Sequence, residues 1–106
     1  MMNMTEKTEL QQQFAGLDLK TDMGVQAMKL ALKFVKVLDE KQQDYGPDNI
    51  TISGELGVIV RSQDKLCRLK HLLGKETVNN ESVSDSWMDL ANYGLIGYMV
   101  HNGKWS

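Results

Sequence analysis

The fold of this chain is decided by two stretches: residues 61–69, RSQDKLCRL, and residues 81–93, ESVSDSWMDLANY. Each has the pattern of a helix. Glu81, Asp85 and Asp89 recur at every fourth position, so their carboxylates lie along one side of the second helix. Charged side chains share one side of the first helix in the same way: Arg61, Asp64, Lys65 and Arg68. Because carboxylates in a row repel one another, we expect cations, a divalent metal or water to compensate them.

Working outward, apolar residues at helical spacing predict an all-α bundle of three main helices. The predicted helices cover about residues 23–45, residues 54–73, and a third stretch that starts at Asn80 or Ser82 and ends at Asn102-Gly103. Thr21 and Asp22 are N-cap candidates for the first helix, and Gly46-Pro47 ends it. The helix glycines Gly94 and Gly97 suggest a close crossing with another helix.

The remaining segments are predicted to be less regular. Residues 1–20 are polar and predict either a mobile arm or a short peripheral N-terminal helix, followed by a single all-α domain over residues 21–106. Residues 48–53 predict a loop that is briefly extended at 50–52, and residues 75–80 predict a polar connector. We expect Trp105 to dock on the body of the domain or on a second subunit.

Composition narrows the classes of function. A chain of 106 residues fits one domain with a modest core, which makes a homo-oligomer the expected assembly. A formal charge of −2 argues against general nucleic-acid binding. One cysteine excludes a disulfide framework within the chain, and we find no signal peptide and no apolar stretch long enough to span a membrane. We therefore expect a cytoplasmic protein without a membrane partner.

The acidic side chains suggest a metal site. Mg²⁺ prefers carboxylate oxygens on a rigid support, and carboxylates one helical turn apart can share one ion. Glu81, Asp85 and Asp89 are candidate ligands, and Asp44, at the end of the first helix, is a fourth candidate that would approach from another direction. The alternative is that Glu81 and Asp85 only favour the start of a helix. Asp89 lies well inside its helix, where a capping role does not apply.

The basic side chains allow two interpretations. Arg61, Lys65 and Arg68 either neutralise the acids of the following helix as a network between helices, or bind the phosphates that a metal bridges. Both interpretations require that the oxygens of the last helix and the nitrogens of the preceding helix converge on one cleft. Further candidate ligand contacts are two tyrosines that suit stacking on a base, Tyr45 and Tyr93, and one amide, Asn92.

The order of these motifs resembles a known family. Asp44-Tyr45-Gly46, then residues 61–69, then residues 81–93 are similar to the phage and bacterial family called nucleotide modification associated domain 1, over roughly residues 25–100. That family looks related to MazG-like and dUTPase-like all-α nucleoside triphosphate pyrophosphatases. The resemblance implies a helical bundle, often oligomeric, that holds Mg²⁺ with acids from two helices and hydrolyses a nucleotide between its α and β phosphates.

The resemblance implies roles for particular residues. In such an enzyme Asp85 and Asp89 are catalytic and hold Mg²⁺ with Asp44 or Glu81, while Arg61, Lys65 and Arg68 bind the phosphates. Those pyrophosphatases carry acid pairs spaced by three, whereas here Glu40 and Glu81 lack an acid three residues later. Two alternatives therefore stay open beside a phage-type hydrolase of nucleotide metabolism. One is a non-catalytic protein that sequesters a nucleotide of host defence signalling, and the other is a protein-interaction module.

Overall fold

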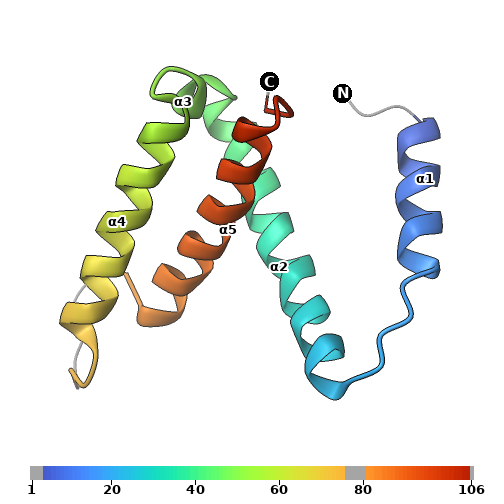
Figure 1. Ribbon diagram of the computed structural model, residues 1–106, viewed down its shortest axis with the longest axis horizontal. Helices are drawn as coiled ribbons and strands as arrows, with labels where there is room; N and C mark the ends of the chain where they lie inside the picture. Colours follow the sequence, from blue (N-terminus) through green and yellow to red (C-terminus); the bar gives the residue numbers. More distant parts are fainter. Residues whose placement is uncertain (1–3, 76–80, 106) are drawn as a thin grey trace. The chain divides into compact units, whose positions relative to one another are not determined.

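The computed structural model describes residues 4–75 and 81–105, and within them the fold is all-α, as predicted (Figure 1). The helices are α1 (Met4–Ala15), α2 (Asp22–Tyr45), α3 (Asp48–Thr51), α4 (Gly54–Leu72) and α5 (Val83–His101). The three long helices agree with the predicted ones to within about two residues at each end that the structure describes. The predicted connector 75–80 lies outside the described residues except for Lys75.

The chain divides into two units, residues 1–30 and residues 31–106. The first unit contains α1, which buries no side chain and confirms the short N-terminal helix of the two alternatives. It also contains the start of α2, where the Thr21 hydroxyl accepts a hydrogen bond from the Gly24 amide at 3.0 Å. This contact is the N-cap that the sequence predicts, because it satisfies an amide that has no partner within the helix.

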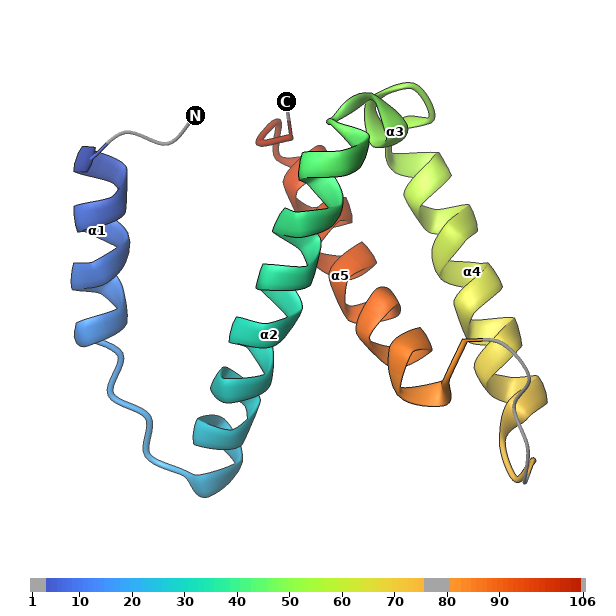
Figure 2. The same ribbon diagram turned by 180° about the vertical axis from the view of Figure 1, so that it is seen from behind.

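The second unit holds the core and the packed helices. In both views α4 and α5 run next to each other, and the C-terminal half of α2 crosses α5 on its way to α3 (Figures 1 and 2). The buried centre of this packing consists of Ile50, Val58 and Ile96, one residue from each of α3, α4 and α5. Gly97 faces α4 at this packing, since a Cβ at this position would lie 3.5 Å from Val58, an ordinary van der Waals distance. Gly94 has no such neighbour within the described residues.

The loop after α2 differs from the prediction. Gly46 ends α2 with a positive φ of 71°, as expected for a left-handed C-terminal glycine. The next residues form the short helix α3 rather than an extended stretch at 50–52. The β-branched residues there suggested extension, but burial of Ile50 decides the conformation, because a helical turn directs this side chain into the core, where only 2% of it is exposed.

The start of α5 is capped locally, and the segment after its end contacts the core. The Ser82 side chain accepts a hydrogen bond from the Asp85 amide at 3.0 Å and caps the helix. Beyond its other end, Trp105 packs against the core and its indole N–H donates to the Pro47 carbonyl at 3.1 Å. Trp105 therefore docks on the body of its own domain, which is one of the two predicted positions. No helix within residues 4–75 and 81–105 is both long and apolar enough to cross a bilayer.

Candidate functional site

A charged cluster joins α4 to the start of α5. Lys65 Nζ lies 2.8 Å from Glu81 Oε2 and 2.9 Å from Asp89 Oδ2, so one ammonium bridges a carboxylate just before α5 and a carboxylate within it. Arg68 donates to the Glu81 backbone carbonyl and, through Nε, to Ser86 Oγ at 3.1 Å. The fully buried Ser86 hydroxyl donates in turn to Glu81 Oε1 at 2.6 Å. We call these five residues the Lys65 network.

Electrostatics keep the Lys65 network charged at neutral pH. Hydrogen bonds from Lys65 and Ser86 lower the pKa of the Glu81 carboxyl below its ordinary value. Burial alone would raise the pKa of Asp89, but hydrogen bonds from Lys65 and Lys41 outweigh it, so this pKa is also lowered. Burial would lower the pKa of Lys65, and its two carboxylate partners outweigh that effect and raise it. The three groups therefore hold one another in their ionised forms.

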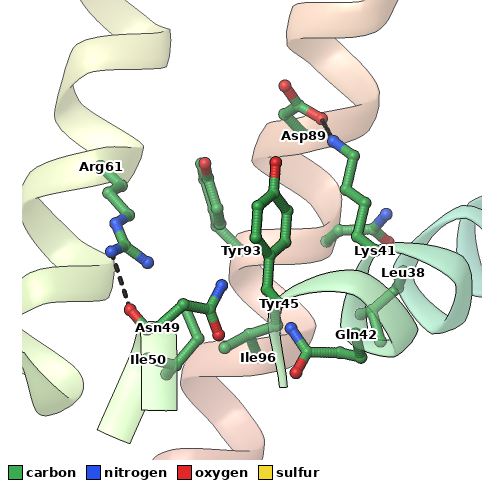
Figure 3. Close-up of a pocket in the computed structure, with 11 residues that line it drawn as sticks. Leu38, Lys41, Gln42, Tyr45, Asn49, Ile50, Arg61, Asp89, Tyr93 and Ile96 are labelled. Carbon is green, nitrogen blue, oxygen red and sulfur yellow. Dashed lines mark hydrogen bonds and ion pairs between the residues drawn. The ribbon is translucent and has the colours of Figure 1, made fainter. Parts of the chain in front are cut away.

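A cavity of about 330 Å³ adjoins the network (Figure 3). Its walls come from the end of α2, the α3 segment, α4 and α5, all within the second unit. The lining residues are Leu38, Lys41, Gln42, Tyr45, Asn49, Ile50, Arg61, Asp89, Asn92, Tyr93 and Ile96. The volume lies at the lower end of the range of small-molecule sites, and the combination of apolar walls with a few polar groups is typical of such sites.

The charges around this cavity favour an anion. Two cations, Lys41 and Arg61, line it against one carboxylate, Asp89. Asp89 is paired with Lys65 at 2.9 Å and with Lys41 at 3.2 Å, so Lys41 is already engaged with a carboxylate, whereas Arg61 has no carboxylate partner among the described ion pairs. Arg61 uses one terminal amino group for the Asn49 backbone carbonyl at 2.8 Å, and Figure 3 shows its other terminal nitrogen directed toward the cavity. A guanidinium in this position suits a phosphate.

The structure brings the α4 cations Lys65 and Arg68 to Glu81, Ser86 and Asp89, and these are the contacts that the network interpretation requires. Both cations are engaged with Glu81, Ser86 or Asp89 rather than directed at an open phosphate site. Arg61 is different, because it lines the cavity together with Asp89. The role of phosphate contact therefore suits Arg61 better than the two other predicted cations.

The three other predicted ligand contacts all line the cavity. Tyr45 and Tyr93 both line it, and in Figure 3 their hydroxyls point in the same direction. Tyr45 is 65% exposed, whereas Tyr93 packs partly against the core. The buried Asn92 has a structural bond as well, since its side-chain N–H donates to the Phe34 carbonyl at 3.0 Å and ties α5 to α2.

The four predicted metal ligands do not gather. Glu81 and Asp89 meet at Lys65, but the Asp85 and Asp44 side chains are exposed and neither makes a described contact with that pair. Across the described ranges no three acidic, histidine or cysteine side chains lie close enough together to hold an ion. Because an ammonium lies between the two nearest carboxylates, this donor set does not fit Mg²⁺ as it stands.

Sequence reasoning missed three residues of this region. Lys41 lies one helical turn before Tyr45 on the same face of α2, and this spacing could have identified Lys41 as a neighbour of the predicted ligand contact. Ser86 was hidden because a serine inside a helix carries no signal of burial. Asn49 was assigned to a loop, and only the helical turn of α3 brings it to the cavity.

Comparison of the chain with protein-family models, with curated proteins and with solved structures finds no match. The resemblance to nucleotide modification associated domain 1 therefore stays a prediction from the motifs.

Proposed function

We propose that this protein binds a nucleotide in the cavity between α2, α3, α4 and α5. The observation that carries the proposal is the pair of cations, Lys41 and Arg61, in a small cavity that is also lined by two tyrosines. Phosphate oxygens would contact the cations, and the base would lie between Tyr45 and Tyr93, because aromatic rings favour stacking on a planar heterocycle. Phosphate binding and base stacking together are the requirements of a nucleotide.

Within this proposal, binding without turnover is favoured over hydrolysis. A pyrophosphatase of the MazG-like type requires Mg²⁺ held by several carboxylates, and Glu81 and Asp89 are instead engaged by Lys65. We therefore derive no metal-dependent step. A protein that sequesters a nucleotide, such as a cyclic dinucleotide of host defence signalling in a phage context, needs only the cavity and its cations. A hydrolase of phage nucleotide metabolism is the competing proposal that the same experiment tests.

The test is calorimetric titration with ATP, UTP and a cyclic dinucleotide, each with and without Mg²⁺, followed by chromatography of the recovered ligand. We expect binding of at least one nucleotide, with the ligand recovered intact. Lys41→Met should weaken binding about tenfold or more, because a charged hydrogen bond is lost. Lys36→Met removes an exposed lysine from the same helix, outside the cavity, and is the matched control.

Two results would contradict parts of the proposal. An absence of heat with every nucleotide, or equal binding by the Lys41→Met and Lys36→Met variants, would remove the assignment of the cavity. Recovery of a nucleoside monophosphate and pyrophosphate only when Mg²⁺ is present would replace sequestration with hydrolysis while keeping the cavity as the binding site.

We also propose that the chain self-associates. The support is an apolar groove of about 410 Å³ along α4 and α5, whose lining includes Val58, Ile59 and Leu66. Ile59 is 47% and Leu66 51% exposed, and contiguous exposed apolar surface marks protein interfaces. A net charge of −2 gives two copies little mutual repulsion, which favours a second copy as the occupant.

Sedimentation or light scattering tests this association. We expect an oligomer for the unmodified chain and a monomer for Leu66→Lys, which places a charge in the groove. Leu56→Lys, at an exposed leucine of α4 that does not line the groove, should leave the oligomer intact. A monomer for the unmodified chain at high protein concentration would refute the proposal.

A further inference from the structure

The cavity carries little positive charge for a ligand as acidic as a nucleotide. Among the described residues that line it, Lys41 and Arg61 are the cations and Asp89 is the carboxylate, which leaves one positive charge in excess. The pKa of Asp89 is lowered, so this carboxylate is ionised at neutral pH and is a fixed negative charge within the site. A phosphate monoester brings about 1.5–2 negative charges at pH 7. A single phosphate group therefore uses up the positive excess of the cavity.

The two cations differ in how free they are to contact a ligand. Lys41 is half-exposed and is paired with Asp89 at 3.2 Å. Arg61 is half-buried, has no carboxylate partner among the described ion pairs, and donates to the Asn49 backbone carbonyl at 2.8 Å. This bond holds the guanidinium in place before a ligand arrives, while its other terminal nitrogen points toward the cavity (Figure 3). Arg61 therefore offers one prepared contact, which suits one phosphate group.

Further phosphates would find no second contact of this kind among the described residues. The other predicted cations of α4, Lys65 and Arg68, are engaged by Glu81, Ser86 and Asp89 and do not line the cavity. Kinases and P-loop NTPases compensate the charge of a triphosphate with a lysine and with Mg²⁺ that bridges the β and γ phosphates. Here each added phosphate would bring negative charge toward Asp89 without a described cation to compensate it.

We infer that the preferred ligand of the cavity is a nucleoside monophosphate, whose single phosphate group contacts Arg61 and Lys41, and that nucleoside di- and triphosphates bind more weakly. This inference deepens the proposed function and rests on it. The volume of about 330 Å³ agrees with the inference, because it lies at the lower end of the range of small-molecule sites and suits one base, one ribose and one phosphate. The number of phosphates is thus selected by the charge that the cavity can compensate.

The test compares nucleotides that differ only in the number of phosphates. The mono-, di- and triphosphates of adenosine, guanosine, cytidine and uridine, together with a cyclic dinucleotide, are titrated calorimetrically in EDTA, so that Mg²⁺ cannot compensate the added charge. For each base that binds, we expect the monophosphate to bind at least about threefold more tightly than the triphosphate. Arg61→Met should weaken binding of the monophosphate about tenfold or more, because a charged hydrogen bond is lost. Lys70→Met, at an exposed lysine of α4 that does not line the cavity, is the matched control.

The outcomes separate this inference from the proposed function. If no nucleotide binds, the proposed function fails, and the inference fails with it. If a triphosphate binds as tightly as its monophosphate, or if only the cyclic dinucleotide binds, nucleotide binding stands and the preference for a monophosphate is refuted. Equal binding of the monophosphate by Arg61→Met and Lys70→Met would refute the role of Arg61. Should Arg61→Met not fold, the comparison of mono- and triphosphates on the unmodified protein still decides the question.

Discussion

Removal of the Lys65 ammonium is the sharpest test of how this fold is held together. In Lys65→Met the methylene chain is largely kept, but Glu81 and Asp89 lose the cation that bridges them at 2.8 and 2.9 Å. The side chains of Lys65 and Asp89 are only 18% and 14% exposed. Exposed ion pairs contribute about 0–1 kcal/mol, and breaking a fully buried pair costs about 3–5 kcal/mol. The Lys65 network is partly buried and lies between those limits, so we expect Lys65→Met to lower the free energy of unfolding by about 2 kcal/mol.

The pH dependence of the free energy of unfolding tests the same prediction independently. Because the folded-state pKa values of Glu81 and Asp89 are lowered, their stabilising effect is complete above the ordinary carboxylate range of about pH 4. It is lost as the pH falls through the lowered values. The raised pKa of Lys65 preserves the effect up to about pH 10, above which it is lost as the ammonium deprotonates. The difference between wild type and Lys65→Met should therefore be constant near neutrality and shrink toward pH 3.

Urea denaturation followed by circular dichroism measures these differences. Lys36→Met, at an exposed position of the neighbouring α2, should change the free energy of unfolding by less than about 0.5 kcal/mol. Adding Asp89→Asn to Lys65→Met should recover part of this loss, about 1 kcal/mol, because without Lys65 the Asp89 carboxylate keeps as its described cation partner the half-exposed Lys41 at 3.2 Å. If Lys65→Met unfolds at the same urea concentration as wild type, or if its deficit stays unchanged in acid, the network does not stabilise the fold in the way we describe.

Three further predictions concern the packing around α5. Ser86→Ala should lower the free energy of unfolding by about 1–2 kcal/mol in urea denaturation, since the buried hydroxyl donates to Glu81; no loss would contradict the bond. Asn92→Leu should cost a similar amount and speed amide exchange in the C-terminal half of α2, because the bond to the Phe34 carbonyl is removed; unchanged exchange would argue against that link. Gly94→Ala should raise the free energy of unfolding by up to about 1 kcal/mol, and with it the melting temperature, because no described atom lies within 4 Å of the new methyl group. A lower melting temperature would show that the position is crowded.

Much of the fold follows from local sequence. Helix-forming apolar spacing and the N-caps Thr21 and Ser82 fix the long helices, and glycines with positive φ after α2 and α4, Gly46 and Gly74, fix where two of them end. These are interactions within about one helical turn, so they require no knowledge of the rest of the chain. The side of α4 that carries Lys65 and Arg68 is determined in the same way, because residues three or four apart share a side of a helix.

The site depends on contacts between segments far apart in the sequence, and these only the tertiary structure decides. The sequence placed Lys65 and Arg68 beside the acids of α5 but left open whether they neutralise those acids or bind phosphate. The packing of α4 against α5 shows the contacts of the first kind, since Lys65 Nζ reaches both Glu81 and Asp89. The helical turn of α3 arises because the core accepts Ile50, and it carries Asn49 to the cavity. Propensity is a weak short-range preference, and burial of an apolar side chain against distant residues overrides it.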